Sequence, residues 1–429
     1  MDVIDLITSE VEFEEGNEHF YGRGSSGLQK LIEKVFTIFN KTIKPKSKVI
    51  IAYSGGKDST ALAIIFYDWL ERTRPEDVEV IFLHNDTLGE IPPMESWARK
   101  FMKQAEHLIG ELGYEVKAII APPPLIDTFY WRVIVRGYPA PSYSFRWCVK
   151  LLKRDPTHRA LREFTGESIL MTGLRESESG DRARNIKRRY GSCSSGAGKC
   201  LAYFFSRENF ENMKKIAPLR DWETIDVWAF LSLDSPFDIS DLLDLYSCEG
   251  ARYGCWFCTL AKVQRGLYSL NDDRYLYLDA ARLLYRKISD MPILRKRKKT
   301  GYSELGALNI AGRAIMLRLF ETVEKISGIT LYSLDEAKTR SGFTLRELFY
   351  ELPAEQAEKI ITLEDPKINP KRRISLQKIK YPEIKQIRII EKTLTKIERG
   401  SRNEKSRKLI LERGFDAVKE IIETIISEF

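Results

Sequence analysis

The stretch Ser54-Gly55-Gly56-Lys57-Asp58-Ser59 joins two apolar segments of the chain. Residues 48–53 before it predict a buried strand, and residues 59–72 predict a helix. A glycine pair between a strand and a helix lets successive N–H groups point inward, and the helix N-terminus adds partial positive charge. The stretch therefore predicts an anion-binding loop, although a glycine pair at such a place can also be ordinary turn chemistry.

The same alternation continues along the chain. Strands are predicted at residues 78–84, 115–121 and 169–173, and helices at residues 27–40, 94–112 and 150–164. Strands separated by helices predict an α/β fold with a doubly wound parallel sheet. Ligands bind beyond the carboxyl ends of such strands. We therefore expect the segments that follow the strand ends to converge on one crevice: the Ser54 loop, His84 to Glu90, the turn Ala121-Pro-Pro-Pro124, and Leu174-Arg175-Glu176.

The length of 429 residues exceeds what one core usually holds, so several domains are expected. From about Gly266 the patterns are helical and rich in Lys, Arg, Ile and Leu, at residues 283–288, 311–326 and 417–426. The expected domains are an N-terminal helical lead (1–47), a nucleotide-binding α/β domain (48–245), a cysteine loop (246–265) and a C-terminal basic helical region (266–429).

The composition predicts a soluble protein of the cytoplasm. It is 43% hydrophobic and 30% charged, and no apolar run approaches the roughly 20 residues of a membrane span. The N-terminal stretch is acidic and lacks the basic start of a secretory signal. We expect no membrane partner.

The net charge of +8 gathers in local clusters. They are Arg182, Arg184, Lys187, Arg188 and Arg189; Arg295 to Lys299; and Lys367, Lys371, Arg372, Arg373, Lys378 and Lys380. Such runs are either solvated faces or the contact surface of an anionic polymer, and the sequence favours neither.

Six cysteines in a cytoplasmic protein argue against a disulfide framework. Cys248, Cys255 and Cys258 lie close together, and Cys148 lies further upstream. Four thiolates suit zinc or a [4Fe–4S] cluster equally, and buried inert cysteines are the third possibility. Cys193 and Cys200 have no place in this set; they are candidates for sulfur relay, for a second metal pair, or for no role.

The Ser54 stretch does not fit the phosphate loop GxxxxGK[ST], because position 51 is Ile and Lys57 is followed by Asp58. It resembles the signature SGGxDS of the PP-loop family, which binds the pyrophosphate side of ATP or a related adenylyl nucleotide. The resemblance implies an adenine nucleotide α-hydrolase-like fold. It also implies phosphate contacts from Ser54, Gly55, Gly56, Asp58 and Ser59, with Lys57 in the variable position.

Further stretches are similar to the branch of that family typified by phosphoadenosine phosphosulfate (PAPS) reductases. They are His84-Asn-Asp-Thr-Leu-Gly-Glu-Ile-Pro, Arg146-Trp-Cys-Val-Lys-Leu-Leu-Lys, Gly173-Leu-Arg-Glu-Ser-Glu-Ser and Ile216-Ala-Pro-Leu-Arg-Asp-Trp-Glu-Thr-Ile-Asp-Val-Trp228. The resemblance covers about residues 48–265. Further nucleotide contacts are then expected at Tyr53, His84, Asp86, Gly173 and Arg175, and catalytic roles at Lys57, Asp58 and Arg175.

Two of these positions have alternatives. Arg175 is a candidate phosphate clamp, or one half of an ion pair with the neighbouring Glu176 or Glu178. The segment with His84, Asp86 and Glu90 either binds ribose or Mg²⁺ or is a hydrogen-bonded loop.

The run Ala251-Arg-Tyr-Gly-Cys-Trp-Phe-Cys-Thr259, with Arg146-Trp-Cys148, closely resembles the DndC family, the iron–sulfur ATP-pyrophosphatase-like proteins of DNA phosphorothioation. That resemblance implies a [4Fe–4S] cluster on Cys148, Cys248, Cys255 and Cys258. It also implies DNA, a cysteine desulfurase and other phosphorothioation subunits as partners. A PAPS reductase reading is weakened because such enzymes carry a reactive cysteine in a Glu-Cys-Gly tail, whereas this sequence has none after Cys258.

The resulting hypothesis is an ATP-dependent sulfurtransferase that uses ATP, Mg²⁺ and the cluster. ATP would adenylate a DNA backbone phosphate, and sulfur would then displace AMP. The alternatives are a tRNA thiolation enzyme, a PAPS or APS reductase-like protein, and a non-catalytic nucleotide-binding Fe–S subunit.

Overall fold

The computed structural model describes residues 25–164, 168–178, 203–205, 213–247, 251–261, 264–270, 272–297 and 305–341, with six residues between 416 and 424. The chain divides into two compact units, which we describe separately. The sheet unit comprises Met1–Asp86, Pro92–Pro122 and Asp155–Glu249, and the cysteine unit comprises Thr87–Ile91, Pro123–Arg154 and Gly250–Phe429. The cysteine unit thus takes two segments from inside the stretch 48–245; the predicted domain borders themselves stay a prediction.

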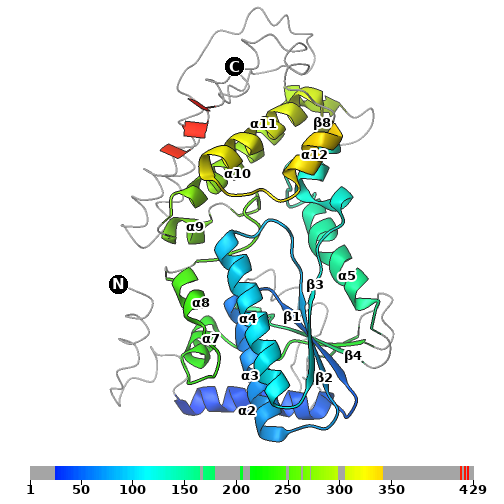
Figure 1. Ribbon diagram of the computed structural model, residues 1–429, viewed down its shortest axis with the longest axis vertical. Helices are drawn as coiled ribbons and strands as arrows, with labels where there is room; N and C mark the ends of the chain where they lie inside the picture. The colour runs from blue at the N-terminus through cyan, green and yellow to red at the C-terminus, as the bar shows by residue number, and fades with distance from the viewer. Residues whose placement is uncertain are drawn as a thin grey trace, which may run out of the picture. The chain divides into compact units, whose positions relative to one another are not determined.

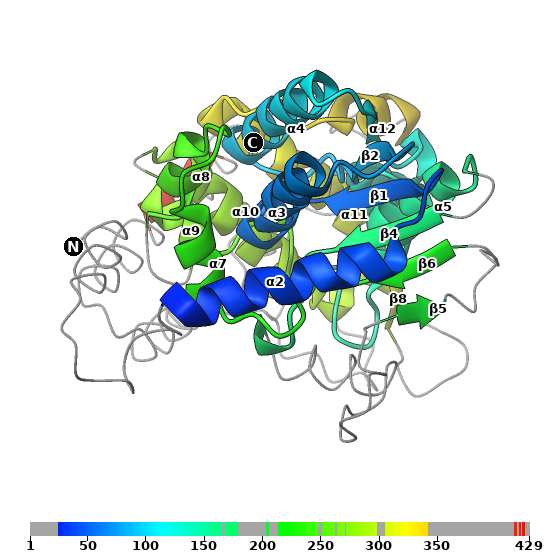
Figure 2. The same ribbon diagram turned by 90° about the horizontal axis from the view of Figure 1, so that it is seen from below.

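A six-stranded sheet forms the centre of the sheet unit, with the order β3-β2-β1-β4-β6-β5 (Figures 1 and 2). The strands are β1 (Lys48–Tyr53), β2 (Glu79–His84), β3 (Glu115–Ile120), β4 (Ser168–Thr172), β5 (Tyr203–Phe205) and β6 (Met213–Ile216). All neighbours are parallel except β5 and β6, which pair antiparallel. The predicted α/β class with a parallel sheet is confirmed.

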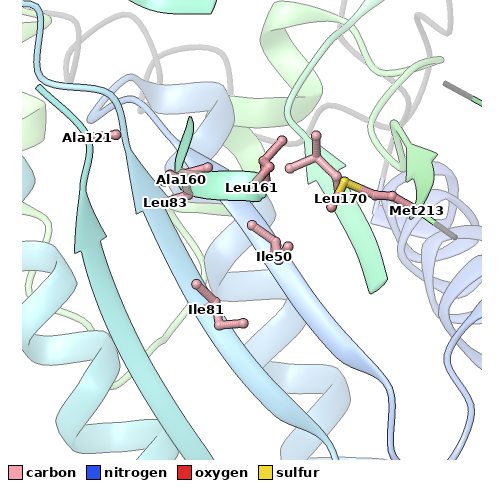
Figure 3. Close-up of a cluster of buried hydrophobic side chains, with 8 residues drawn as sticks. All are labelled: Ile50, Ile81, Leu83, Ala121, Ala160, Leu161, Leu170 and Met213. Atoms are coloured by element: carbon pink, nitrogen blue, oxygen red, sulfur yellow. The ribbon is translucent and has the colours of Figure 1, made fainter. Parts of the chain in front are cut away.

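Alternate residues of the strands face two different layers of helices. On one face, α5 (Asp155–Leu161) places Ala160 and Leu161 in a buried cluster with Ile50 of β1 and Leu170 of β4 (Figure 3). On the other face the ring of Tyr53 stacks on Phe101 of α4 (Pro92–Glu111). Both faces of the central strands are therefore apolar, as in a doubly wound sheet.

Further helices of the sheet unit are α2 (Ser25–Thr42), α3 (Lys57–Thr73), α7 (Thr224–Leu231) and α8 (Ser240–Leu245), with a 3₁₀ turn η4 (Glu176–Glu178). Phe39 of α2 meets Phe66 of α3 edge to face, with ring centroids 5.5 Å apart. Lys100 of α4 forms ion pairs of 2.9 Å with Asp238 and Asp241.

The chain reverses its direction of travel across the sheet at β1. β2 and β3 lie on one side of β1, whereas β4 and β6 lie on the other. A crevice forms where the strand order reverses in this way, beyond the carboxyl ends of the strands. The loop after β1 and the residues after β4 are therefore the natural ligand position of the sheet unit.

The cysteine unit is mainly helical where it is described. Its helices are η1 (Leu125–Asp127), η2 (Trp131–Val135), η3 (Val149–Arg154), α9 (Arg265–Ser269), α10 (Arg274–Ser289), η5 (Pro292–Leu294), α11 (Ile310–Ser327) and α12 (Leu334–Ser341). A small hairpin pairs β7 (Arg295–Arg297) with β8 (Leu305–Leu308). The ring of Phe129 stacks on Phe257 with centroids 3.8 Å apart, and Tyr285 and Phe320 meet Phe129 edge to face.

Two of the three helical segments predicted after Gly266 lie within α10 and α11. Only part of the third, residues 417–426, is among the described residues. The helix predicted at residues 150–164 is wrong in detail, because π-helical η3 gives way to α5 at Asp155. Pro156 explains the change, since a proline has no N–H for the preceding turn but suits the first turn of a new helix.

No helix in the described part of the chain is long and apolar enough to cross a membrane.

Asp68 on α3 gives a test of this packing. Partial burial raises the pKa of its carboxyl from 3.8 to about 6; Glu71 adds to the rise and Arg72 opposes it. Because the folded-state pKa lies above that of the unfolded chain, ionised Asp68 lowers the stability. The penalty is complete above about pH 6 and fades as the pH falls towards about 3.8.

We expect Asp68→Asn to raise the thermal midpoint by roughly 2 °C at about pH 8, after allowance for solvent screening, and by less at about pH 4.5. Differential scanning fluorimetry of both proteins at both pH values measures the gain. Equal gains at the two pH values would contradict the raised pKa.

Candidate functional site

The loop between β1 and α3 folds back on its own backbone. Gly55 has a φ of +75°, in the left-handed region, and a Cβ there would lie 3.1 Å from the Cβ of Ala98. Ser59 Oγ donates to the carbonyl of Gly56 at 2.8 Å and accepts from Ser54 N at 3.2 Å. A curled glycine loop at the start of a helix is the backbone arrangement that binds phosphate.

Side chains from neighbouring elements hold this loop from the protein side. Trp97 of α4 donates from Nε1 to the carbonyl of Gly55 at 2.9 Å. His84 donates from Nδ1 to the carbonyl of Tyr53 at 3.1 Å, and both side chains are buried. His84 thus braces the backbone of Tyr53 at the start of the loop, and the nucleotide contacts of both residues stay a prediction. Asp86 is also buried and pairs with Arg99 at 3.3 Å.

A buried arginine orients the acidic residue of the loop. Arg175 is 1% exposed, and its Nε donates to Asp58 Oδ1 at 2.8 Å. The rest of its guanidinium donates to Ser177 Oγ, to the carbonyl of Trp222 and to Thr224 Oγ1. The partner of Arg175 is thus Asp58 and not a neighbouring glutamate; Glu176 pairs with Arg220. This geometry favours an orienting role for Arg175 over direct contact with a phosphate.

Lys57 lies beside the same carboxylate. Its Nζ is 3.3 Å from Asp58 Oδ2 and 5.7 Å from the centroid of the Tyr246 ring. Two cations thus share one carboxylate at the start of α3, where the helix N-terminus adds further positive charge. The net charge at the start of α3 is therefore positive, and a positive charge attracts an anion.

Gly173 after β4 leaves room for this start of α3. A Cβ on Gly173 would lie 2.7 Å from the carbonyl oxygen of Asp58 and 3.0 Å from the backbone nitrogen of Ser59. Both atoms are backbone and cannot move aside easily. The two strand ends that flank the switch point therefore meet at the predicted loop.

In the cysteine unit, the short segment Thr87–Ile91 is attached to the predicted cysteine loop. Trp256 N donates to the carbonyl of Gly89 at 2.7 Å. A Cβ on Gly89 would lie 2.1 Å from the ring of Phe257, so only glycine fits there. Gln264 Nε2 donates to the carbonyl of Cys255 at 3.1 Å and closes the loop from the other side.

The side chains of the two segments also meet at sulfur. The Sγ of Cys255 lies 3.1 Å from Thr87 Oγ1 and 4.0 Å from Glu90 Oε1. Thr87 in turn lies 2.7 Å from both carboxylate oxygens of Glu90. Glu90 thus takes part in a hydrogen-bonded loop within the cysteine unit, which is one of the alternatives that the sequence leaves open.

Three cysteines of this unit share one electrostatic neighbourhood. Burial raises the pKa of the Cys255 thiol to about 12, against the pull of Lys153. Burial also raises the pKa of the Cys148 thiol, and Cys258 adds to the rise. The pKa of Lys153 is raised by Cys255 first, and then by Glu90, Cys258 and Cys148. The donor set suits a thiolate-held metal group, because such a group supplies the positive charge that buried thiolates need.

A complete ligand set is not among the described residues. No three His, Cys, Asp or Glu side chains within them are arranged to hold a metal ion. Cys248 lies outside the described residues, as do Cys193, Cys200, the cluster Arg182 to Arg189 and the cluster Lys367 to Lys380. The tetrad of Cys148, Cys248, Cys255 and Cys258 stays a prediction.

Sequence reasoning missed Thr87, Trp97, Lys153 and Tyr246. Thr87 and Lys153 lie inside stretches quoted for the family resemblance, but no spacing singled them out. Trp97 and Tyr246 reach the loop only through folding, from α4 and from the end of α8.

Residues 48–261 match the phosphoadenosine phosphosulfate reductase domain family. Two uncharacterised proteins of Methanocaldococcus jannaschii are similar in sequence. One is 25% identical over 59% of this chain and 53% of its own length, and the other is 27% identical over 52% and 38%. The chain therefore spans about half or less of these curated relatives.

Two solved structures show a weak likeness. The U34-tRNA thiolase NcsA from Methanococcus maripaludis, with its [4Fe–4S] cluster, is 14% identical at a TM-score of 0.31 and covers 86% of this chain and 93% of its own. The FMN adenylyltransferase of Candida glabrata, in complex with FAD and pyrophosphate, is 14% identical at a TM-score of 0.30, covering 53% and 63%. The sheet order, and not these likenesses, establishes the fold. Membership of the phosphorothioation branch stays a prediction.

Gly173→Ala tests the contact between the two strand ends. The added methyl group would meet the backbone of Asp58 and Ser59, so we expect the loop to shift and ATP binding to weaken about tenfold or more. Titration with a fluorescent ATP analogue measures the affinity. Gly110→Ala is the matched control, because a Cβ at Gly110 meets nothing within 4 Å. Equal affinities of the two variants would contradict the role given to Gly173.

Proposed function

We propose, from the phosphoadenosine phosphosulfate reductase-like domain of residues 48–261, that this protein is an ATP-dependent sulfurtransferase of DNA phosphorothioate modification. One observation carries the proposal: the chain combines a pyrophosphate-type loop, backed by the Asp58–Arg175 pair, with a cysteine unit in which Cys148, Cys255 and Cys258 each interact electrostatically with Lys153. The first feature suits adenylyl transfer, and the second suits sulfur chemistry.

In the proposed first step an oxygen of a DNA backbone phosphate attacks the α-phosphorus of ATP. The bond from the α-phosphorus to the bridging oxygen breaks, and pyrophosphate leaves. The backbone N–H groups of the loop and the start of α3 hold the pyrophosphate, while Lys57 adds positive charge at the mouth of the loop. Arg175 keeps Asp58, and through it the first turn of α3, in place. The chain thus contributes positioning and charge stabilisation.

In the second step sulfur at the oxidation level of sulfide attacks the adenylated DNA phosphorus. The phosphorus–oxygen bond to AMP breaks, AMP leaves with the electron pair, and a phosphorothioate remains. No electron is gained or lost in this step. We propose that a cysteine desulfurase and the other phosphorothioation subunits deliver the sulfur. The desulfurase supplies it as a persulfide, and a thiol reductant releases the outer sulfur as sulfide while a disulfide forms.

Cys148, Cys255 and Cys258, with Cys248, would hold a [4Fe–4S] cluster, which when bound would present sulfide-level sulfur. Lys153 would lie beside the thiolates and offset their negative charge. Mg²⁺ would enter with the phosphates of ATP, as it usually does; we assign it no residue, because both oxygens of Asp58 already contact cations.

A tRNA thiolation enzyme would use the same adenylation and send the sulfur to a base. The acceptor separates the two reactions. We expect DNA, and not tRNA, to stimulate pyrophosphate release. Stimulation by tRNA and not by DNA would mean that tRNA is the acceptor.

Asp58→Asn tests the loop. It removes the charge that pairs with Arg175 and Lys57 while keeping the shape of the side chain, so we expect pyrophosphate release to fall about 100-fold or more. A coupled pyrophosphate assay measures the rate, and iron content should stay unchanged. Asp68→Asn, on the same helix but away from the loop, should keep the wild-type rate. Unchanged turnover in Asp58→Asn would remove the loop from the mechanism.

Cys255→Ala tests the cysteine set. We expect anaerobically purified variant protein to lose most of its iron and acid-labile sulfide, while ATP binding persists. Cys193→Ala, outside the predicted ligand set, is the matched control and should keep its iron. Stoichiometric zinc, or no metal, in the unaltered protein would contradict the cluster.

A further inference from the structure

A tight turn precedes Cys148 in the cysteine unit. Ser142 N donates to the carbonyl of Phe145 at 3.3 Å, and Phe145 N donates back to the carbonyl of Ser142 at 3.1 Å. Ser142 Oγ also accepts from Phe145 N at 3.2 Å. These bonds close the turn and leave Tyr143 and Ser144 at its tip. We call residues 139–147 the Tyr143 turn.

The base of the Tyr143 turn is fixed to the rest of the unit. Trp147 is buried and donates from Nε1 to the carbonyl of Pro139 at 2.9 Å. Ala140 N donates to Ser289 Oγ of α10 at 2.9 Å. Thr259, next to Cys258, donates from Oγ1 to the carbonyl of Pro141 at 2.7 Å. The tip is therefore presented from a rigid support, beside two of the predicted cluster cysteines.

The Tyr143 turn exposes two aromatic rings. Tyr143 is 73% exposed and Phe145 is 46% exposed. The guanidinium of Arg146 lies over the Tyr143 ring, 5.0 Å from its centroid. Val149, one residue past Cys148, is 46% exposed. Single exposed apolar residues need no explanation, but two aromatic rings on a fixed turn mark an interaction surface.

The surrounding chain is strongly basic. Residues 128–154 contain six basic side chains (Arg132, Arg136, Arg146, Lys150, Lys153 and Arg154) and no acidic one. Arg146, Lys150 and Arg154 are exposed. Arg132 forms an ion pair with Asp127 and adds little to the surface charge. The exposed cations attract a polyanion, and this attraction is sensitive to salt.

Exposed rings interleaved with cations fit one kind of polyanion best. Proteins bind single-stranded nucleic acid by stacking bases on aromatic side chains while Lys and Arg follow the phosphates. A closed duplex exposes its phosphates but not its base faces, so its bases could not stack on the rings of Tyr143 and Phe145. A membrane surface would require a wider apolar face than two rings.

We propose that the Tyr143 turn binds an unpaired stretch of the substrate DNA, with bases stacked on Tyr143 and Phe145 and phosphates held by Arg146 and Lys150. This inference rests on the proposed function and names the form in which the DNA is recognised. The turn would hold a locally opened strand beside the cysteines. Paired DNA would first have to open there.

Fluorescence anisotropy with the full chain tests this inference. The probes are a labelled DNA single strand, the same strand in a blunt duplex, and the ribonucleotide strand of the same sequence. We expect the DNA single strand to bind most tightly. Tyr143→Ala should weaken its binding about tenfold, as the loss of one stacked base predicts, and Tyr143→Trp should restore it.

Salt dependence separates stacking from charge. Lys150→Ala should lower the slope of the logarithm of affinity against the logarithm of salt concentration by about one, whereas Tyr143→Ala should leave that slope unchanged. Tyr332→Ala is the matched control, because Tyr332 belongs to the same unit, is 51% exposed and lies far along the chain from the turn. Its affinity should equal that of the unaltered protein.

Three results would overturn the inference: equal binding of duplex and single strand, no loss in Tyr143→Ala, or preference for the ribonucleotide strand. The proposed function fails separately. If DNA stimulates pyrophosphate release while Tyr143→Ala binds single strands normally, the turn is excluded and the activity stands. If single-strand binding depends on Tyr143 but no pyrophosphate forms, the activity is excluded and the turn stands.

Discussion

The buried contact between Arg175 and Asp58 is the constraint on which the sheet unit depends. Arg175 is 1% exposed and gives its donors to four groups, one of them Asp58 at the first turn of α3. A guanidinium removed from water is tolerated only when its donors are satisfied. The end of β4, the approach to α7 and the start of α3 are therefore held in one arrangement. The loop before α3 takes its shape from that arrangement, and Trp97 and His84 secure its other side.

A comparable constraint shapes the cysteine unit. Gly89 lies so close to the ring of Phe257 that no side chain fits at its position, and the carbonyl of Gly89 accepts from Trp256 N. The segment Thr87–Ile91 is thereby tied to the loop of Cys255 and Cys258. In the chain this segment directly follows Asp86, two residues past the end of β2.

The residues of the loop and the cysteines would serve different steps of the proposed reaction. The loop residues offer positive charge and backbone N–H groups, which suit a leaving pyrophosphate. The cysteines, with Lys153 beside them, suit sulfur. The Tyr143 turn adds a surface for the acceptor, joined to the cysteine loop by the hydrogen bond from Thr259 to Pro141. Each part meets one demand of sulfur transfer to an activated phosphate, which is why the combination supports the proposal better than any part alone.

The sequence by itself determined the class of the fold and the place of the loop. Apolar runs such as residues 48–53, separated by helical patterns, are a local signal of a parallel sheet, and two adjacent glycines before a helix are a local signal of an anion site. The spacing of Cys255 and Cys258 is equally local. The short strand β6 escaped prediction, because Met213-Lys-Lys-Ile216 has no apolar run and becomes a strand by pairing with β4.

Only the tertiary structure decided what the polar residues near the loop do. Arg175 could pair with Glu176, with a phosphate or with Asp58, and the choice depends on bringing together residues 117 positions apart. His84 and Tyr53 are the last residues of β2 and β1, and only folding joins them through the hydrogen bond from the His84 ring to the carbonyl of Tyr53. Glu90 likewise lies 4.0 Å from the sulfur of Cys255 because folding brings together residues 165 positions apart. Sequence patterns report which face or end of an element a residue occupies, whereas the partner of a buried charge is fixed by packing.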